Sequence, residues 1–321
     1  MIEISNVSIG FETIRRRTKK DGAANPAAES GTGDMFALDG VSLSIPEGCV
    51  YGILGSNGAG KSTLLRLICG VYRPDDGSVM IDGEKVWDNE KAKEKVFFVN
   101  DETVQFTEYT PKELANYYSC YYEGFSVEMF DRLTEQLGLP VNRRLSTFSK
   151  GMKRQAIVAL GLSSGTKYLL IDEAFDGLDP AMRKLVKNMI TDAVLDRGTT
   201  VLISSHNVTE ISEYCDRAVL IHKGKIVFSG EIDEIRGGLC KVQFVRKESP
   251  VTREEIEQTG LEVLQYTLLG SIAQAILRGD SDTVSEKIGQ VSSDLAEQIP
   301  LTLEEVFVYE LKARGYGDET D

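Results

Sequence analysis

Short, continuous apolar runs recur along the chain, and each ends in small or polar residues. Four of them are Val50–Leu54, Val96–Val99, Tyr168–Ile171 and Thr200–Ile203. Runs of this length without alternation are typical of strands buried on both faces, as in a parallel sheet. A helical run, Ser62–Ile68, follows the first of them after a short loop. The pattern therefore predicts an α/β fold built around a parallel sheet.

The loop between the first strand and its helix, Gly55–Ser62, reads GSNGAGKS and has every fixed position of the phosphate-binding pattern GxxxxGK[ST]. Its glycines let the backbone curl so that amide N–H groups point inward, where the helix adds its positive end. We expect Lys61 to reach the β- and γ-phosphates and the Ser62 hydroxyl to ligate Mg²⁺. A chance glycine-rich turn would not have both the strand before it and the helix after it. The predicted nucleotide-binding residues of this segment are Gly55, Ser56, Asn57, Gly58, Ala59, Gly60, Lys61, Ser62 and Thr63.

Polar side chains follow two further predicted strands. Asp172 and Glu173 end the run Tyr168–Ile171, and His206 ends the segment that begins at Thr200. The carboxyl ends of strands in an open α/β sheet border the ligand crevice. Asp172 can then hold the Mg²⁺ water shell, and Glu173 can polarise the attacking water. For a histidine the alternative is a hydrogen-bonded loop residue, which we favour for His222, in the hairpin-like segment VLIHKGKIVFSG.

A third segment, Leu145–Gln155, reads LSTFSKGMKRQ and opens a helix at Ser149. With the phosphate loop, FSKGMKRQ, YLLIDEAFDGLD and the serine-serine-histidine strand end in this order, the chain resembles an ATP-binding cassette (ABC) ATPase. The resemblance covers residues 1 to about 236. It implies a P-loop NTPase sheet core with an antiparallel β subdomain and a helical signature subdomain at about 104–160.

The resemblance also implies a role for each matching residue. It makes Asp172 the Walker B carboxylate, Glu173 the catalytic base and His206 the switch histidine, with Lys61 acting on the phosphates. Asp179 becomes the D-loop residue. The signature motif is Ser149, Lys150, Gly151 and Met152. The family usually has a second glycine where this chain has Lys150, a variant that resembles export-type cassettes.

The chain has one phosphate loop and one signature helix, yet a complete site in this family needs both. In the family, the signature helix of one protomer caps the ATP bound to the other, offering Ser149, the Gly151 backbone and a helix N-terminus. We therefore expect a second cassette subunit, identical or not, with two ATP molecules at the interface. Closure would depend on the γ-phosphate, so that hydrolysis reopens the dimer.

One position departs from the family pattern. A glutamine that touches the metal or the water usually follows the strand Val96–Val99, and Asp101 falls on that position here, while Gln105 comes too late without an inserted turn. A carboxylate could meet Mg²⁺ through water, but it would repel the γ-phosphate where an amide would not. A second metal residue at Asp101 and a solvated loop acid both remain open.

In the family that the chain resembles, an aromatic ring near the end of the first strand stacks on the adenine base. Phe11 lies in the matching place, and Phe36 is its competitor because residues 13–34 interrupt the region. Stacking tolerates either purine, so it would not strongly enforce ATP over GTP. The insert begins with basic residues and continues into Ala, Gly, Asn, Ser and Pro, a composition that predicts a mobile loop.

Between the phosphate loop and the signature, Thr110, Pro111 and Glu113 form a predicted capping box, and Ser126 is a predicted cap of a second helix. An aromatic cluster lies between these helix starts. We expect core packing for Leu114, Tyr117 and Tyr121 and propose a permease-docking role for Tyr122 and Phe125.

After residue 236 the pattern changes to short strands at Leu239–Val245, Leu261–Leu269 and Ser271–Leu277, with helix starts at Thr252 and Thr302. These predict a small C-terminal α/β appendage over 237–321, an accessory domain with no catalytic constellation. The ending LTLEEVFVYEL resembles the tail of export-type cassette subunits whose permease is a separate chain. Regulation or dimer support is the inferred role.

The composition of the chain agrees with an ATPase that does not itself span the membrane. The 321 residues are 41% hydrophobic, and no apolar run approaches the ~20 residues that span a bilayer. The chain start lacks a basic segment followed by a long apolar one, so we expect no signal peptide and a cytoplasmic location, peripheral on the cell membrane. Its five cysteines are scattered, which suits a reducing compartment. A net charge of -14 argues against nucleic-acid binding.

Two classes of function are open at this point. The first is the ATP-hydrolysing subunit of an ABC exporter that drives an integral membrane permease and uses ATP and Mg²⁺. The alternative is a soluble ABC ATPase acting on the ribosome or on DNA, although such relatives usually carry two cassettes or a long coiled-coil insertion. A nucleoside kinase would have no use for the segment Ser149–Gln155.

Overall fold

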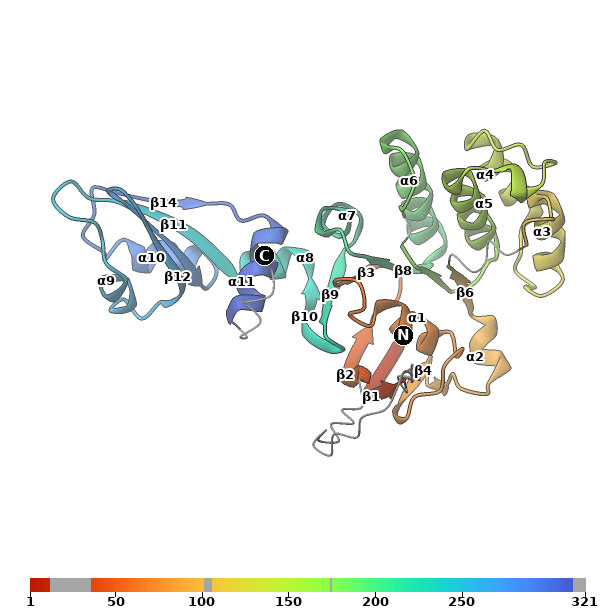
Figure 1. The fold of residues 1–321 in the computed structure, drawn as a ribbon, viewed down its shortest axis with the longest axis horizontal. Helices are drawn as coiled ribbons and strands as arrows, with labels where there is room; N and C mark the ends of the chain where they lie inside the picture. The colour runs from red at the N-terminus through yellow and green to blue at the C-terminus, as the bar shows by residue number, and fades with distance from the viewer. Residues whose placement is uncertain (12–35, 101–105, 174, 314–321) are drawn as a thin grey trace, which may run out of the picture. The chain divides into compact units, whose positions relative to one another are not determined.

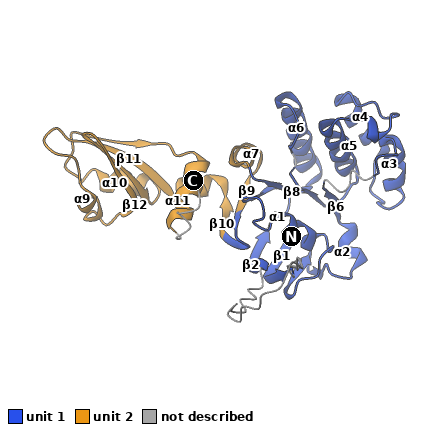
Figure 2. Cartoon of the chain, in the orientation of Figure 1, with its two compact units in different colours: residues 1–206, 220–226 blue, residues 207–219, 227–321 orange. Residues whose placement is uncertain are grey.

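The structure is a computed structural model that describes residues 1–11, 36–100, 106–173 and 175–313. The chain forms two compact units (Figure 2): residues 1–206 with 220–226, and residues 207–219 with 227–321. The predicted insert 13–34, Asp101 and Gln105 lie outside the described residues. The boundary predicted at residue 236 stays a prediction.

A six-stranded sheet runs through the first unit in the order β10-β9-β3-β8-β7-β6, and β9 and β10 cross the division between the units. Its strands are β3 Val50–Leu54, β6 Val96–Val99, β7 Tyr168–Ile171, β8 Thr200–Ser205, β9 Arg217–His222 and β10 Lys225–Glu231. The pairs β3–β8, β8–β7 and β7–β6 are parallel. Every residue of β3, β7 and β8 is buried. This burial confirms the inference from their continuous apolar runs.

A four-stranded antiparallel sheet, in the order β2-β1-β4-β5, completes the β structure of the first unit. Its strands are β1 Ile2–Gly10, β2 Phe36–Ile45, β4 Asp76–Ile81 and β5 Glu84–Lys85. The burial of β1 and β2 alternates along most of their length. Such alternation is expected where one face of a sheet packs on a core. The predicted antiparallel β subdomain is present.

The helices of the first unit are α1 Lys61–Ile68, α2 Glu90–Glu94, α3 Pro111–Ser119, α4 Val127–Gln136, α5 Lys150–Ser163 and α6 Pro180–Arg197. Helices α3, α4 and α5 pack on one another as the helical subdomain (Figure 1). The predicted capping box at Thr110 is formed, because its hydroxyl accepts from Glu113 N–H while the Glu113 carboxylate accepts from Thr110 N–H. Ser126 caps α4 as predicted.

The aromatic cluster of α3 is oriented differently from the prediction. Leu114 is buried as expected, but Tyr117 and Tyr121 are 41% and 64% exposed. Tyr118 and Tyr122 turn inward instead and contact Phe97 of β6 at ring-centroid distances of 5.1 and 5.3 Å. The prediction of core packing for Tyr117 and Tyr121 is therefore wrong, because the end of α3 and the turn after it place Tyr118 and Tyr122, a pair of the same spacing, against the sheet.

In the second unit, the region after residue 237 has the order β11-α9-β12-β13-α10-β14, with strands arranged β12-β13-β11-β14 and every neighbouring pair antiparallel. This is the ferredoxin-like βαββαβ topology. Its elements are β11 Leu239–Val245, α9 Arg253–Glu257, β12 Glu262–Leu269, β13 Ile272–Arg278, α10 Ser281–Ile288 and β14 Leu295–Ile299. The predicted strands and both helix starts are confirmed, whereas α10 and β14 carry no strong sequence signal.

Three more helices belong to the second unit: α7 Val208–Tyr214, α8 Ile232–Gly237 and α11 Leu303–Ala313. Helix α11 contacts both α7 and α8. A small cluster of Leu239, Ile276 and Val306 ties α11 to the sheet face opposite α9 and α10. Within the described ranges, no helix combines the length and apolarity that crossing a membrane requires.

Candidate functional site

The predicted phosphate loop connects β3 to α1, and its backbone can be built only with glycine at two points. Gly60 has φ 113°, and a Cβ there would lie 2.5 Å from the Ala37 carbonyl oxygen. A Cβ on Gly55 would lie 2.4 Å from the Ile221 carbonyl oxygen. Both distances are far inside van der Waals contact, so any side chain would displace the loop. The loop is thus held in the tight form that phosphate binding requires.

Lys61 is the first residue of α1, and its side chain is buried, only 5% exposed. Its Nζ donates to the carbonyl oxygens of Gly55 (2.8 Å) and Ser56 (3.2 Å). The same Nζ lies 3.6 Å from Glu173 Oε1. A buried ammonium group needs such partners, because removing it from water without them costs on the order of several kcal/mol. The loop therefore concentrates positive charge next to Glu173.

Asp172 and Glu173 follow β7 directly, and β8 holds them through one buried hydroxyl. Ser204 Oγ donates to Asp172 Oδ1 and accepts from the Glu173 backbone N–H at 3.0 Å. Asp172 N–H donates to the Val99 carbonyl at 2.8 Å, which extends the sheet by one residue. These bonds fix two neighbouring carboxylates at the carboxyl edge of the parallel strands, as the sequence predicted.

His206 reaches the same edge from the residue after β8. Its Nδ1 lies 3.0 Å from Glu173 Oε2. Glu173 also has φ 52°, a left-handed conformation that a residue with a side chain adopts at a cost. Strained backbone held by surrounding hydrogen bonds is common where a side chain must be aimed. Glu173 thus lies between Lys61 and His206, with one carboxylate oxygen toward each.

The signature segment begins α5. Ser149 Oγ accepts from Met152 N–H (3.2 Å), so this hydroxyl caps the helix. Gly151 is packed so closely that a Cβ would meet the Gly177 carbonyl oxygen at 2.7 Å. Ser149 and Gly151 therefore lie together at the positive end of a helix, next to the loop after β7.

Lys150, the residue in place of the family's glycine, reaches that loop as well. Its Nζ is 2.7 Å from Asp176 Oδ2. This hydrogen bond holds the pKa of Asp176 below its usual range. Further along the same helix, Arg154 Nη1 donates to the Asp172 carbonyl (3.1 Å). Helix α5 is thus linked to the segment that follows β7 at two points.

Two further predicted residues have local structural roles. Asp179 caps α6, because its Oδ1 accepts from Met182 N–H at 3.0 Å. Phe11 is 48% exposed and meets Tyr72 edge-on with ring centroids 5.4 Å apart. Its competitor, Phe36, is exposed to a similar degree. The roles of Asp179 at the D-loop and of Phe11 at the base stay predictions.

The donor set is one that suits Mg²⁺. A hydroxyl at Ser62 and a carboxylate at Asp172 are hard oxygen ligands, and Mg²⁺ commonly takes one or two of these with phosphate oxygens and water. A fully protein-made metal cage is a different arrangement, and among the described residues no group of three or more His, Cys, Asp or Glu could hold an ion. Asp101, the other predicted metal residue, lies outside the described residues.

Ser204 is the functional residue that sequence reasoning did not single out. It is fully buried in β8, where its neighbours toward the start of the strand are apolar. A fully buried hydroxyl needs a hydrogen-bond partner. That requirement is the signal that could have pointed to Asp172 and Glu173.

Comparison with known proteins agrees with this geometry. Residues 38–176 match the family described as "ABC transporter". The chain is 28% identical to the ABC transporter ATP-binding protein YtrB of Bacillus subtilis, covering 84% of this chain and 91% of the relative. It is 32% identical to the ABC transporter ATP-binding protein NatA of the same organism, and the match covers 62% of this chain and 83% of NatA.

Among solved structures, one titled "Structure of ATP binding subunit of ABC transporter" superimposes with a TM-score of 0.61. Its sequence is 25% identical, and the match covers 73% of this chain and 91% of that one. The α/β class predicted from the sequence is confirmed. With the phosphate loop and the Lys61, Glu173 and His206 cluster in one fold, the chain belongs to the ATP-binding proteins of ABC transporters, and it is an ATP hydrolase of that family.

Proposed function

We propose that this chain is the ATPase subunit of a membrane exporter, and that Glu173 activates the water that cleaves ATP. The observation that carries the proposal is the position of its carboxylate, 3.0 Å from His206 Nδ1 and 3.6 Å from Lys61 Nζ. A general base must be held and aimed before it can accept a proton. Ser204 adds a third contact to Glu173, because its hydroxyl accepts a hydrogen bond from the Glu173 backbone N–H.

Each residue then has one task in the reaction. Lys61 and the loop amides bind the β- and γ-phosphates, and the bonds from Lys61 to loop carbonyls are exchanged for bonds to phosphate oxygens. Glu173 accepts the proton of the attacking water, while His206 orients Glu173 and faces the γ-phosphate. Bound Mg²⁺, held by Ser62 and Asp172, would neutralise charge on the phosphates.

The working unit in this proposal is a pair of cassettes. Ser149 and Gly151 stand at the N-terminus of α5, where a helix presents positive charge to an anion. In a pair, this end caps the γ-phosphate held by the partner's loop. Hydrolysis removes that contact and opens the pair, which is how ATP turnover would drive a second subunit.

The partner on the membrane side is proposed to be an integral permease on a separate chain, with the cassette at the cytoplasmic face. The exposed aromatic patch, defined as Phe106, Tyr109, Tyr117 and Tyr121, is its docking surface. Its rings contact one another at centroid distances of 4.9 to 6.1 Å, and each is 39% exposed or more. Exposed aromatic residues in a contiguous patch are enriched where proteins meet. This patch replaces Tyr122 in the docking hypothesis.

Export rather than import is proposed from the chain itself. The ending LTLEEVFVYEL and the lysine at 150 resemble export-type subunits. The segment forms α11, which begins at a Thr302–Glu305 capping box and is anchored by buried Val306 and Phe307. The segment that resembles export-type subunits is therefore a packed helix of the second unit.

A pull-down tests the proposal. Tagged Glu173→Gln is purified from detergent-solubilised native membranes with ATP, and co-purifying chains are identified by mass spectrometry. We expect a second cassette and a multi-span membrane protein, because a site that binds but does not cleave ATP stays closed. Turnover of this variant should fall by about 10²-fold or more.

The matched control is the same variant with ADP, which should release the second cassette. Ribosomal or DNA-associated proteins in place of a membrane protein would favour the alternative class. Normal turnover by Glu173→Gln would remove the role given to Glu173. Vesicles carrying the recovered permease, with the cassette outside, then report the direction of transport.

A further inference from the structure

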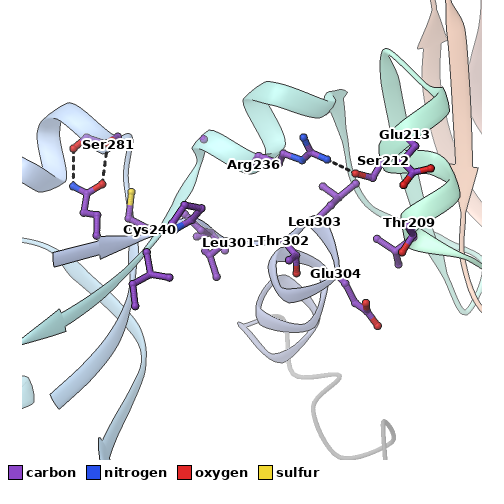
Figure 3. A pocket seen from close by; sticks show the side chains of 16 residues that line it. Thr209, Ser212, Glu213, Arg236, Cys240, Ser281, Leu301, Thr302, Leu303 and Glu304 are labelled. Atoms are coloured by element: carbon purple, nitrogen blue, oxygen red, sulfur yellow. Dashed lines mark hydrogen bonds between the residues drawn. The ribbon is translucent and has the colours of Figure 1, made fainter. Parts of the chain in front are cut away.

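The second unit contains a cavity of about 910 Å³ that the ATPase site does not use (Figure 3). Its walls come from α7, α8, β11, β14 and the start of α11, and α10 contributes Ser281. All lining residues belong to this one unit. Sites for drug-sized molecules usually have volumes of roughly 300–1,000 Å³. The cavity is therefore large enough for an organic ligand.

The floor of the cavity is apolar. Leu239 and Leu303 are buried there, and Leu301 and Ile299 also line the cavity. Cys240, the next residue of β11, lines it from the opposite face of that strand. Burial also raises the pKa of the Cys240 thiol, which keeps that side chain uncharged. A ligand that covers this floor needs an apolar body.

The charged groups at the rim favour one sign. Glu213 of α7 and Glu304 of α11 line the cavity, against a single cation, Arg236. The Arg236 guanidinium is directed at the Ser212 hydroxyl, to which it donates (Figure 3). Gln298 is also engaged, since its side-chain amide donates to the Ser281 carbonyl and to the Ser285 hydroxyl. Arg236 and Gln298 are thus engaged within the protein, and the carboxylate of Glu304 on the rim suits a cationic head group.

Glu304 is the residue best placed to meet such a head group. It lies in the first turn of α11, is exposed, and forms no ion pair with any residue in the described part of the chain. Its neighbour Glu305 differs, because its carboxylate accepts from Thr302 N–H and pairs with Lys241. A cation at Glu304 would thus gain a charge partner without breaking an existing pair.

We propose that this cavity binds an amphipathic organic cation, with the apolar body on Leu239, Leu301 and Leu303 and the cationic head at Glu304. The site lies outside the ATPase machinery. Its occupant would contact α7, which begins two residues after His206: Asn207, the residue between them, caps this helix by accepting from Thr209 N–H (2.9 Å). Binding therefore couples to ATP turnover through α7, a step that rests on the proposed function.

The test uses two probes of the same size and shape but opposite charge, tetraphenylphosphonium and tetraphenylborate. Binding of each to the full-length chain is measured by equilibrium dialysis. We expect the cation to bind and the anion to bind at least about fivefold more weakly, in line with the loss of one or two partly exposed charge contacts. Glu304→Gln should weaken cation binding about threefold to fivefold and leave anion binding unchanged or stronger.

The matched control is Glu286→Gln on α10, an exposed carboxylate of the same unit that does not line the cavity. It should bind the cation as the unaltered chain does. Equal binding of both probes, absence of cation binding, or equal weakening by both substitutions would each overturn the site.

ATP turnover is a separate arm. The cation should change the rate for the unaltered chain and for Glu286→Gln, and the change should require higher probe concentrations in Glu304→Gln. A cation that binds with the expected selectivity but leaves turnover unchanged would remove the coupling and keep the site. Absence of turnover without any probe would instead count against the proposed function.

Discussion

At the scale of single residues, the ATPase site depends on side chains that hold other side chains. Ser204 is the clearest case, because one hydroxyl bonds both the Asp172 carboxylate and the Glu173 backbone. It touches neither ATP nor water in the proposed mechanism. Its contribution is position, which for a general base and a metal ligand decides how often the correct geometry is present.

Ser204→Ala should therefore lower ATP turnover about tenfold, and it should raise the Mg²⁺ concentration needed for half-maximal rate, since Asp172 loses its orienting donor. Turnover is measured across a Mg²⁺ titration. Ser164→Ala, which also removes a buried hydroxyl but lies at the far end of α5, is the control for stability alone. An unchanged Mg²⁺ dependence in Ser204→Ala would contradict the positioning role.

A second prediction at this scale concerns thiol reactivity. Burial raises the pKa of the Cys69 thiol to about 11, whereas Cys120 is exposed. Thiolates react with iodoacetamide and thiols do not, so at pH 8 only a minute fraction of Cys69 is reactive. Brief alkylation of the folded chain followed by peptide mass spectrometry should label Cys120 and spare Cys69. Comparable labelling of both would mean that the surroundings of Cys69 open readily.

At the scale of elements, much of the fold could be predicted from the sequence. Strands β3, β7 and β8 are continuous apolar runs, and the Thr110 capping box marks the start of α3. Which side chains of α3 and the turn after it are buried could not be predicted from such a pattern. Tyr117 with Tyr121 and Tyr118 with Tyr122 have the same helical spacing, and Phe97 of β6, far away in sequence, selects the second pair.

The candidate site, like the fold, could be predicted from the sequence only in part. The loop Gly55–Ser62 and the strand-end residues Asp172, Glu173 and His206 were identified because local patterns place them at one sheet edge. The role of Ser204 cannot be predicted in this way, because it depends on the register of β7 beside β8, in which Ile171 pairs with Ile203. Register across strands is set by tertiary packing and is only weakly encoded in one strand.

The orientation of α3 gives a prediction with a built-in comparison. Tyr122→Ala removes a ring that packs on Phe97 and a hydroxyl that donates to the Val96 carbonyl, so it should lower the free energy of unfolding by about 2–3 kcal/mol. Tyr121→Ala removes an exposed ring and should change it by less than about 0.5 kcal/mol. Urea denaturation of both variants measures the difference. For permease binding in the pull-down the order should reverse, with Tyr121→Ala the more harmful; equal effects would place the docking surface elsewhere.

At the scale of the whole molecule, each compact unit has a core of its own. The second unit contains a cluster that includes Val242, Phe244 and Val284, all fully buried, under the helices of its ferredoxin-like sheet. The first unit contains the parallel sheet and the nucleotide site. Separate cores allow separate cooperative unfolding, since cooperativity reflects shared packing.

The single tryptophan makes this testable, because Trp87 lies in the first unit and reports on that unit alone. Far-UV circular dichroism reports on both units. In urea, the two signals should give transitions that do not coincide. Saturating Glu173→Gln with Mg²⁺ and ATP should move the fluorescence transition to higher urea, by about 2.7 kcal/mol at 100 times the dissociation constant, because the ligand binds only the folded first unit. The part of the circular dichroism change that belongs to the second unit should stay where it was. Coincident transitions that move together on adding ATP would instead mean that the two units unfold as one, and that the accessory unit contributes directly to the stability of the nucleotide site.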